Sequence, residues 1–337
     1  MNHPLPPAEI GIDLGGTATR LIAWHDSQAI AEKTVATRIF AETSPAQRIR
    51  RLWDLVRAVP PAGYRITGIG IGASGPVDPR TGTIENPDTL ACFSGVALAT
   101  RLTEIAGVPV VVENDAVTAA LGEFHHGAGR GADRMLMATL GTGIGVAVLQ
   151  NGQPFRLADG RHPEAGHIPV SASPEICYCG LTGCWEPTAS REALENDIRS
   201  VKPQYPEGDL IDIAARSALN GDMHARRVFD AYGCRVGRGL ALLHSVYGPR
   251  LTVIGGSISG HLDVFRAGLE DALHRAAGFD PRVPVVAAEL GPKAGAVGAA
   301  IMASSSAQAG LSRGTKIQKQ SKYRSPAVTI TSIEAYS

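Results

Sequence analysis

Strand-like and helix-like hydrophobic patterns alternate in the first part of the chain. Residues 9–24 (EIGIDLGGTATRLIAW) alternate apolar and polar positions around two consecutive glycines, which predicts two strands joined by a tight turn. Residues 44–59 open with Ser-Pro and carry apolar side chains on one helical face, which predicts a helix. Residues 65–78 predict a strand that runs into a glycine-bounded loop.

The same order of elements returns in the second part. Residues 108–124 begin with a short continuous apolar run, which predicts a buried parallel strand, and continue as a polar loop and a helix. Residues 134–152 again predict strand, glycine turn and strand. A long helix is expected over 224–248, a strand ending in glycines over 250–260, and a helix over 261–278. Each half opens on a strand-turn-strand unit, so we expect two related α/β domains with a cleft between them.

The domain limits follow from these patterns. We expect an N-terminal domain over 1–118 and a C-terminal domain over 119–304, with a hinge near 115–125. The last helix, about 293–304, is expected to pack back on the N-terminal domain. Residues 305–337 lose the periodicity and are rich in basic side chains, so we expect a disordered tail.

Length and charge narrow the class of protein. A chain of 337 residues accommodates about two domains. The formal net charge of zero gives the whole molecule no electrostatic reason to bind nucleic acid or anionic lipid. No apolar run approaches the roughly 18 to 20 residues of a membrane span, and no signal peptide is recognisable. We therefore expect a cytoplasmic protein.

The five cysteines fall into two groups. Cys92 and Cys234 stand alone in apolar segments and are expected to be buried, inert core residues. The other three lie within residues 177–184, too close together for a disulfide framework.

The clustered cysteines predict a structural zinc site. Thiolate and imidazole are preferred ligands of Zn²⁺, and His167 stands ten residues before the first cysteine. The glycines between the cysteines let the chain double back, so Cys177, Cys179, Cys184 and His167 could close a tetrahedron. A loop of three unrelated thiols is the weaker alternative, because such residues with turn glycines between them rarely coincide. Four protein ligands leave no open position for substrate.

Two glycine turns could bind phosphate. In DLGGTATR (13–20) and TLGTGIG (139–145), the glycines let backbone N–H groups approach an anion, and threonines add hydroxyl donors. Either turn alone is equally explained by hairpin geometry. As a pair, one in each half, they suggest a nucleotide gripped between two domains. Neither fits the Walker or Rossmann pattern.

Three polar residues, Glu113, Asn114 and Asp115, follow the buried strand of the first half. The carboxyl ends of such strands hold the ligand sites of α/β proteins. Asn or Asp is equally suited to capping the next helix, and the segment alone leaves both interpretations open.

Taken in order, these motifs resemble a known family. DLGGTATR, ENDA, GTGIG, PEAGH, CYCGLTGCWE and VIGGSIS follow the order and spacing of the ROK family of bacterial repressors, open reading frames and sugar kinases. The resemblance covers about residues 9–303. It implies two ribonuclease-H-like (actin-like ATPase) α/β domains, usually in a homodimer, that close on ATP and a sugar in the cleft between them.

Position by position, the resemblance implies a role for each motif residue. Asp115 would be the catalytic base and Asp13 would help hold Mg²⁺. The sugar would contact Ser74, Gly75, Asn86, Asn114, Asp115, Glu164, His167 and Glu186. ATP would contact Asp13, Gly15, Gly16, Thr17, Thr19, Thr139, Gly141, Thr142, Gly143, Gly255 and Gly256. The structural Zn²⁺ would be bound by His167, Cys177, Cys179 and Cys184.

The resemblance implies an ATP-dependent sugar kinase, with O6 of glucose as the expected acceptor. N-acetylmannosamine, N-acetylglucosamine, fructose and allose stay open, because the chain departs from the family near the expected sugar site at Pro163, Val146 and Phe93. The competing interpretation is a sugar-sensing, non-catalytic regulator. Regulators of this family begin with a winged helix-turn-helix, for which the first motif at residue 9 is expected to leave no room. We therefore expect sugar and ATP as partners, and neither nucleic acid nor a membrane.

Overall fold

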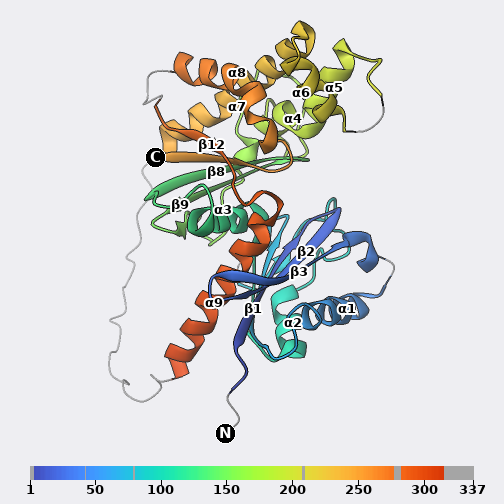
Figure 1. The fold of residues 1–337 in the computed structure, drawn as a ribbon, viewed down its shortest axis with the longest axis vertical. Coiled ribbons are helices and arrows are strands. Elements are labelled where there is room, and N and C mark those ends of the chain that lie inside the picture. Colours follow the sequence, from blue (N-terminus) through green and yellow to red (C-terminus); the bar gives the residue numbers. More distant parts are fainter. Residues whose placement is uncertain (1–3, 42, 79, 207–208, 277–281, 315–337) are drawn as a thin grey trace, which may run out of the picture.

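Two five-stranded sheets, each covered by helices, lie one above the other in the molecule (Figure 1). The computed structural model describes residues 4–41, 43–78, 80–206, 209–276 and 282–314, with side chains up to residue 305. The architecture is the mixed α/β arrangement expected from the sequence.

The first sheet has the strand order β3-β2-β1-β4-β7. Its first three strands are antiparallel, and β4 and β7 continue parallel to β1. The strands are β1 (Pro7–Leu14), β2 (Ala18–His25), β3 (Gln28–Ala36), β4 (Arg65–Ala73) and β7 (Val110–Asn114). A small hairpin, β5 (Val77–Asp78) with β6 (Thr83–Ile84), lies in the loop after β4.

Alternate residues of β1 face opposite layers of helices. Ile10 and Ile12 are buried in a core with α1 (Pro45–Arg57) and α2 (Leu98–Ala106). Gly11, between them, lies directly against Ala296 and Ala300 of α9 (Ala294–Gly314) on the other face. Figure 1 shows α9 on one side of this sheet and α1 and α2 on the other. The last helix therefore packs on the first sheet.

The second sheet repeats this plan with the order β10-β9-β8-β11-β12. Its strands are β8 (Arg134–Leu140), β9 (Ile144–Gln150), β10 (Gln153–Pro154), β11 (Leu251–Gly255) and β12 (Val285–Ala287). One face packs on the helices α4 (Trp185–Ala189), α5 (Arg191–Val201), α6 (Leu210–Leu219), α7 (Met223–Tyr247) and α8 (Leu262–Arg275). The other face packs on α3 (Asp115–His126), which starts at the end of β7. Both sheets are thus buried on two faces.

Several boundaries differ from the sequence expectations. The polar loop expected after β7 does not exist, because Asn114 ends the strand and caps α3 directly. The region 115–125, where we expected a hinge, forms α3, so the hinge and the domain limits remain predictions. Helix α9 continues to Gly314, so residues 305–314 are helical rather than part of a disordered tail. The rest of that tail, 315–337, lies outside the described residues.

The isolated cysteines also differ from expectation. Cys92 and Cys234 are both only half-buried. Cys92 still packs against the core of the first half.

Among the helices of the described ranges, none combines the length and apolar character that crossing a membrane requires.

Candidate functional site

The carboxylate of Asp115 is held where two parallel strands of the first sheet end together. Ala73 of β4 pairs with Asn114 of β7, so the residues that follow them meet. The hydroxyl of Ser74 donates to Oδ2 of Asp115 at 2.8 Å, and the Ala116 amide donates to Oδ1 at 2.8 Å. Asp115 is the first residue of α3, where a negative charge is favoured by the helix dipole.

Asn114 combines the two roles that the sequence left open. Its Oδ1 accepts from the amides of Ala116 and Val117, which caps α3. Its Nδ2 lies beside Gly75, where an added Cβ would be 2.9 Å from that nitrogen. The residue therefore fixes the helix with one end of its amide and faces the loop after β4 with the other.

The loop after β4 contributes Gly75 and Asn86. Nδ2 of Asn86 donates to the carbonyl of Gly75 at 3.0 Å. A Cβ at Gly75 would also lie 3.8 Å from Oε1 of Glu164, which belongs to the second half of the chain. The fold thus brings Gly75, Asn86, Asn114 and Glu164 together.

Two raised pKa values show that four carboxylates share one electrostatic environment. Burial, then the charges of Asp115 and Glu186, raise the pKa of Glu164 to about 7. Burial and the charge of Asp115 raise the pKa of Asp13 to about 7, against the opposing effect of Arg20. Such a group favours a bound cation or the hydroxyl donors of a polyol.

The first glycine turn, within residues 13–20, exposes some of the residues that were predicted to donate to a phosphate. Gly16 and Thr17 are exposed between β1 and β2, and Gly15 is half-buried. Thr37 supports the turn, since its hydroxyl donates to the Gly15 carbonyl at 2.6 Å. Thr19 is fully buried and its hydroxyl is 2.9 Å from that of Thr37. This position argues against a direct phosphate contact by Thr19, which instead stabilises the turn from below.

The second glycine turn is bound to the zinc-loop segment. The amide of Ile144 donates to Oε2 of Glu186 at 2.8 Å, and Gly143 leaves room for that carboxylate because it has no Cβ. Thr142 is exposed, whereas the Thr139 hydroxyl donates to the carbonyl of Gly145 at 3.3 Å. Glu186 therefore links the predicted sugar site to a predicted phosphate turn.

The end of β11 lies beside this second turn. An added Cβ at Gly141 would be 3.8 Å from Oγ of Ser257. Gly256 is exposed and has φ +82°, a conformation that favours glycine. Gly255 is buried against Met137, so its lack of a side chain serves the packing of the sheet.

The cysteine segment folds into a cluster that fits a tetrahedral metal ion. The donor atoms of His167, Cys177, Cys179 and Cys184 all lie within 4.8 Å of one another. Nδ1 of His167 is 3.5 Å from Sγ of Cys177, and the sulfurs of Cys179 and Cys184 are 3.6 Å apart. Ligands about 2.0 to 2.3 Å from a tetrahedral zinc lie about 3.3 to 3.8 Å from one another. The residues present therefore fit Zn²⁺.

Sequence reasoning missed the partners of the motif residues. Buried Glu113 accepts from the Asn114 amide at 2.8 Å and pairs with Arg156 of the second half. Nε2 of buried His162 is 3.8 Å from Oε1 of Glu164, and burial lowers the pKa of His162. Glu113 stands in the polar group that the sequence marks after β7, whereas Arg156 and His162 have no signal beyond their closeness to the PEAGH motif.

Two positions at which the chain departs from the family pattern, Phe93 and Val146, have buried side chains. Phe93 is fully buried and packs edge to face on Phe40, with centroids 5.1 Å apart. Val146 is buried in the core of the second half. That these positions lie close to the sugar stays a prediction, as it does for Pro163, which directly precedes Glu164.

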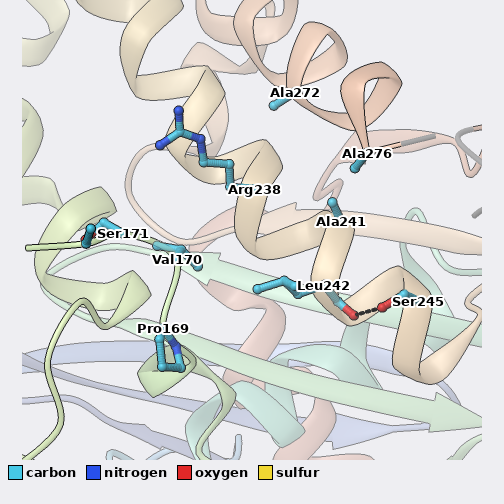
Figure 2. A pocket seen from close by; sticks show the side chains of 10 residues that line it. Pro169, Val170, Ser171, Arg238, Ala241, Leu242, Ser245, Ala272 and Ala276 are labelled. Atoms are coloured by element: carbon cyan, nitrogen blue, oxygen red, sulfur yellow. Dashed lines mark hydrogen bonds between the residues drawn. The ribbon is translucent and has the colours of Figure 1, made fainter. Parts of the chain in front are cut away.

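A separate hollow of about 730 Å³ lies behind the zinc loop, between Pro169–Ala172 and the helices α7 and α8. Figure 2 shows Leu242 and Ala241 of α7 beside Val170, with Ala272 of α8 above them. Its lining contains none of the predicted site residues and is mostly apolar.

Comparisons with known proteins agree with the geometry. Residues 9–306 match the sequence model of the ROK family. A glucokinase of Thermotoga maritima is 30% identical over 304 residues, covering 86% of this chain and 95% of that protein. A ROK family glucokinase from Streptomyces griseus, solved in complex with glucose and AMPPNP, has a TM-score of 0.75 and 31% identity, covering 88% of this chain and 99% of that one. A putative xylose repressor of Caldicellulosiruptor is 28% identical, covering 80% of this chain and 70% of that protein.

Proposed function

The chain belongs to the ROK family, and we propose that it is an ATP-dependent sugar kinase that transfers the γ-phosphoryl group to a hexose hydroxyl. The observation that carries the proposal is the placement of Asp115. Its carboxylate is fixed by Ser74 and by the start of α3, and it shares its electrostatic environment with Glu164 on the sugar side and Asp13 on the nucleotide side.

Asp115 is the general base of the proposed reaction. Its two oxygens each accept one hydrogen bond from the protein, and a carboxylate has about four acceptor positions, so acceptor capacity remains for a sugar hydroxyl. As the oxygen of that hydroxyl bonds to the γ-phosphorus of ATP, the bond from that phosphorus to the β,γ-bridging oxygen breaks and ADP leaves, while the hydroxyl proton passes to Asp115. A positioned base of this kind is typically worth about 10² to 10⁴ in rate.

Sugar binding is assigned to the residues around Asp115. The proposed sugar space is surrounded by amide and carboxylate groups, which belong to Asn114, Glu164, Glu186, Asn86 and the backbone of Gly75. Such groups suit a polyol, because each can accept from or donate to a defined hydroxyl. Among acceptors we favour O6 of glucose, in keeping with the glucokinases among the relatives. N-acetylmannosamine, N-acetylglucosamine, fructose and allose are the alternatives.

Nucleotide binding is assigned to the two glycine turns and the end of β11. Phosphoryl transfer proceeds through a loose transition state, so positioning and charge neutralisation dominate its catalysis. Exposed Gly16, Thr17 and Thr142 can present donors to phosphate oxygens. Asp13 would hold Mg²⁺, which when bound neutralises charge on the phosphates.

The zinc cluster is assigned a structural role. With four ligands from the chain it offers no open position to substrate. The loop that it fixes runs directly into Trp185 and Glu186, and Trp185 is fully buried. The ion would therefore set the position of Glu186 and His167 relative to the sugar.

The test is Asp115→Asn, which keeps the shape and the hydrogen bond with Ser74 but removes the base. We expect kcat to fall by about 10² or more with little change in sugar affinity, measured by coupled ADP release and by calorimetry. Asp54→Asn, an exposed carboxylate on α1, is the control. Near-normal turnover in Asp115→Asn would remove Asp115 from this role.

A sugar-sensing regulator is the second candidate, favoured by the similarity to the putative xylose repressor. Such a protein would bind sugar without turning over ATP. A panel of hexoses and N-acetylhexosamines with ATP and Mg²⁺, beside a DNA mobility-shift assay, separates the two functions. A homodimer is proposed on the resemblance alone.

A further inference from the structure

His162 is a buried histidine whose ring nitrogens form no hydrogen bond with any residue that the structure describes. It is only 6% exposed and lies in the segment between β10 and the short 3-10 helix at Ala165–His167. Its nearest polar neighbour is Oε1 of Glu164, which is 3.8 Å from Nε2 and too far for a hydrogen bond. Buried polar side chains are nearly always hydrogen-bonded, so this imidazole is expected to find its partner in a bound molecule.

His244 of α7 shows how the same chain satisfies a histidine that belongs to a core. It is 7% exposed, and its Nε2 lies 2.8 Å from Oγ1 of Thr252 on β11. A histidine kept for packing alone would have such a partner. His162, with equal burial, has none among the described residues.

The ring of His162 lies on the side of its segment that faces the proposed sugar space. Pro163 restricts the residue before it to extended backbone, and in extended backbone the side chains at positions i and i+2 point to the same side. The oxygen of Glu164 nearest to the ring is Oε1, which is also the atom beside Gly75. His162 therefore lies next to the groups assigned to the sugar.

The charged groups around His162 are already engaged with other partners. Glu113 pairs with Arg156, and Asp115 accepts from Ser74. Burial lowers the pKa of His162, although the charges of Glu113 and Asp115 oppose this, so the ring is neutral at pH 7. A neutral imidazole has one N–H donor and one acceptor nitrogen, and a sugar hydroxyl can pair with either.

We propose that His162 is a further specificity-determining residue of the acceptor site, where one of its ring nitrogens forms a hydrogen bond with a hydroxyl of the sugar beside Glu164. The proposal rests on the sugar-kinase function above and adds to the contacts assigned there without replacing any of them. A sugar that lacks this hydroxyl leaves the buried imidazole unpaired and is rejected for that reason.

The test compares hydroxyl groups one at a time. Calorimetry measures the Kd for the hexose that the substrate panel selects, with glucose expected, and for each of its monodeoxy analogues. In His162→Phe, which keeps a flat ring but has no nitrogen, we expect the Kd for the intact sugar to rise about tenfold. The loss of affinity on removing one particular hydroxyl should shrink to about twofold or less in this variant, whereas the losses for the other hydroxyls persist. His162→Gln, which keeps a donor and an acceptor, should bind the intact sugar within about threefold of the unaltered protein.

Two further variants control for folding. His162→Ala adds no volume and should show the same selective change as His162→Phe, so the test does not depend on one variant. His244→Phe is the matched control, because it removes an equally buried imidazole away from the proposed site, and it should keep the loss for every hydroxyl.

The proposal is overturned if no hydroxyl changes its contribution in His162→Phe and His162→Ala. It is equally overturned if all hydroxyls lose their contributions alike, because the residue would then act only through the folding of its segment. Binding measured by calorimetry does not depend on turnover. A selective change in a chain that turns over no ATP would support the role of His162 and contradict the kinase function alone.

Discussion

Each carboxylate of the proposed site takes its character from what surrounds it. Asp115 accepts from Ser74 and a helix amide, whereas Glu186 accepts from a glycine-turn amide. Glu164 has the buried imidazole of His162 at 3.8 Å and interacts electrostatically with two other carboxylates, those of Asp115 and Glu186. Groups of one chemical type are thus prepared for different tasks.

The raised pKa values predict how stability depends on pH. Glu164 and Asp13 have ordinary pKa values of 4.5 and 3.8, and both are raised to about 7 in the folded chain. Between about pH 4 and 7 the folded state therefore keeps protons that the unfolded chain has released, and the free energy of unfolding falls as pH rises through this window. In Glu164→Gln we expect the decrease in Tm from pH 5 to 8 to be about half as steep, because Asp13 still contributes.

Melting curves of both proteins at several pH values check this prediction. Glu175→Gln, an exposed carboxylate before the zinc loop, serves as the control. A slope equal to that of the unaltered protein would show that Glu164 titrates as an ordinary carboxyl group.

At the scale of single residues, the sequence predicted the motif positions and missed their partners. The four zinc-ligand candidates lie in one short segment, and turn glycines with φ +89° and +71° at Gly180 and Gly183 bring them together. Glu113 and Arg156, in contrast, are separated along the chain by helix α3 and the strands β8, β9 and β10. A contact of that kind depends on the register of two sheets, which local patterns do not determine.

Among the elements, α3 and α9 connect the two sheets. Helix α3 leaves the first sheet to cover the second, and α9 follows the second sheet to cover the first. The helices cross in backbone contact, because an added Cβ at Gly298 would overlap the carbonyl of Thr118, and one at Gly122 would overlap that of Ala294. Small residues are required where two backbones meet in this way.

The close contact between α3 and α9 predicts how one methyl group added at the crossing changes the free energy of unfolding. We expect Gly298→Ala to lower the free energy of unfolding by about 2 to 3 kcal/mol, since neither backbone can move away from the Cβ without disturbing a sheet. Urea unfolding followed by circular dichroism measures it. In Gly260→Ala the added Cβ meets no atom of the described residues within 4 Å, so we expect a change near zero. Equal stability of the two variants would contradict the close crossing.

The same contact explains why α9 was only partly predictable. Its first turns, AGAVGAAIMA, are small and apolar on all sides and show no amphipathic period. Such a helix is stable because it is buried between β1, β4 and α3. Its extension to Gly314 is likewise invisible in the pattern, whereas the capped start of α1 was evident from Ser44 and Pro45.

For the whole molecule, the proposed cleft is bridged by the segment between β10 and the short 3-10 helix at Ala165–His167. Arg156 of this segment pairs with Glu113, and Arg161 pairs with Glu85 at 3.1 Å. Both acids belong to the first half of the chain. The sequence predicted two halves and a cleft but could not show that one segment ties them together beside Glu164.

The exposed ion pair between Arg161 and Glu85 predicts that the KM for the sugar depends on salt concentration. Arg161 and Glu85 are 39% and 45% exposed, so their attraction is worth at most about 1 kcal/mol and is screened by salt. We expect Arg161→Gln to raise the KM for the sugar about two- to fivefold at low salt, with kcat and Tm nearly unchanged. The KM of the unaltered protein should rise with salt toward that of the variant. Glu85→Gln should have the same effect, and the double variant should be no worse than either single one, because both remove the same interaction. Losses of sugar affinity that add up in the double variant would contradict this prediction, and so would a salt dependence that persists in it. Either result would show that other charges hold the two halves together, and the pair between Arg156 and Glu113 would be the first to examine.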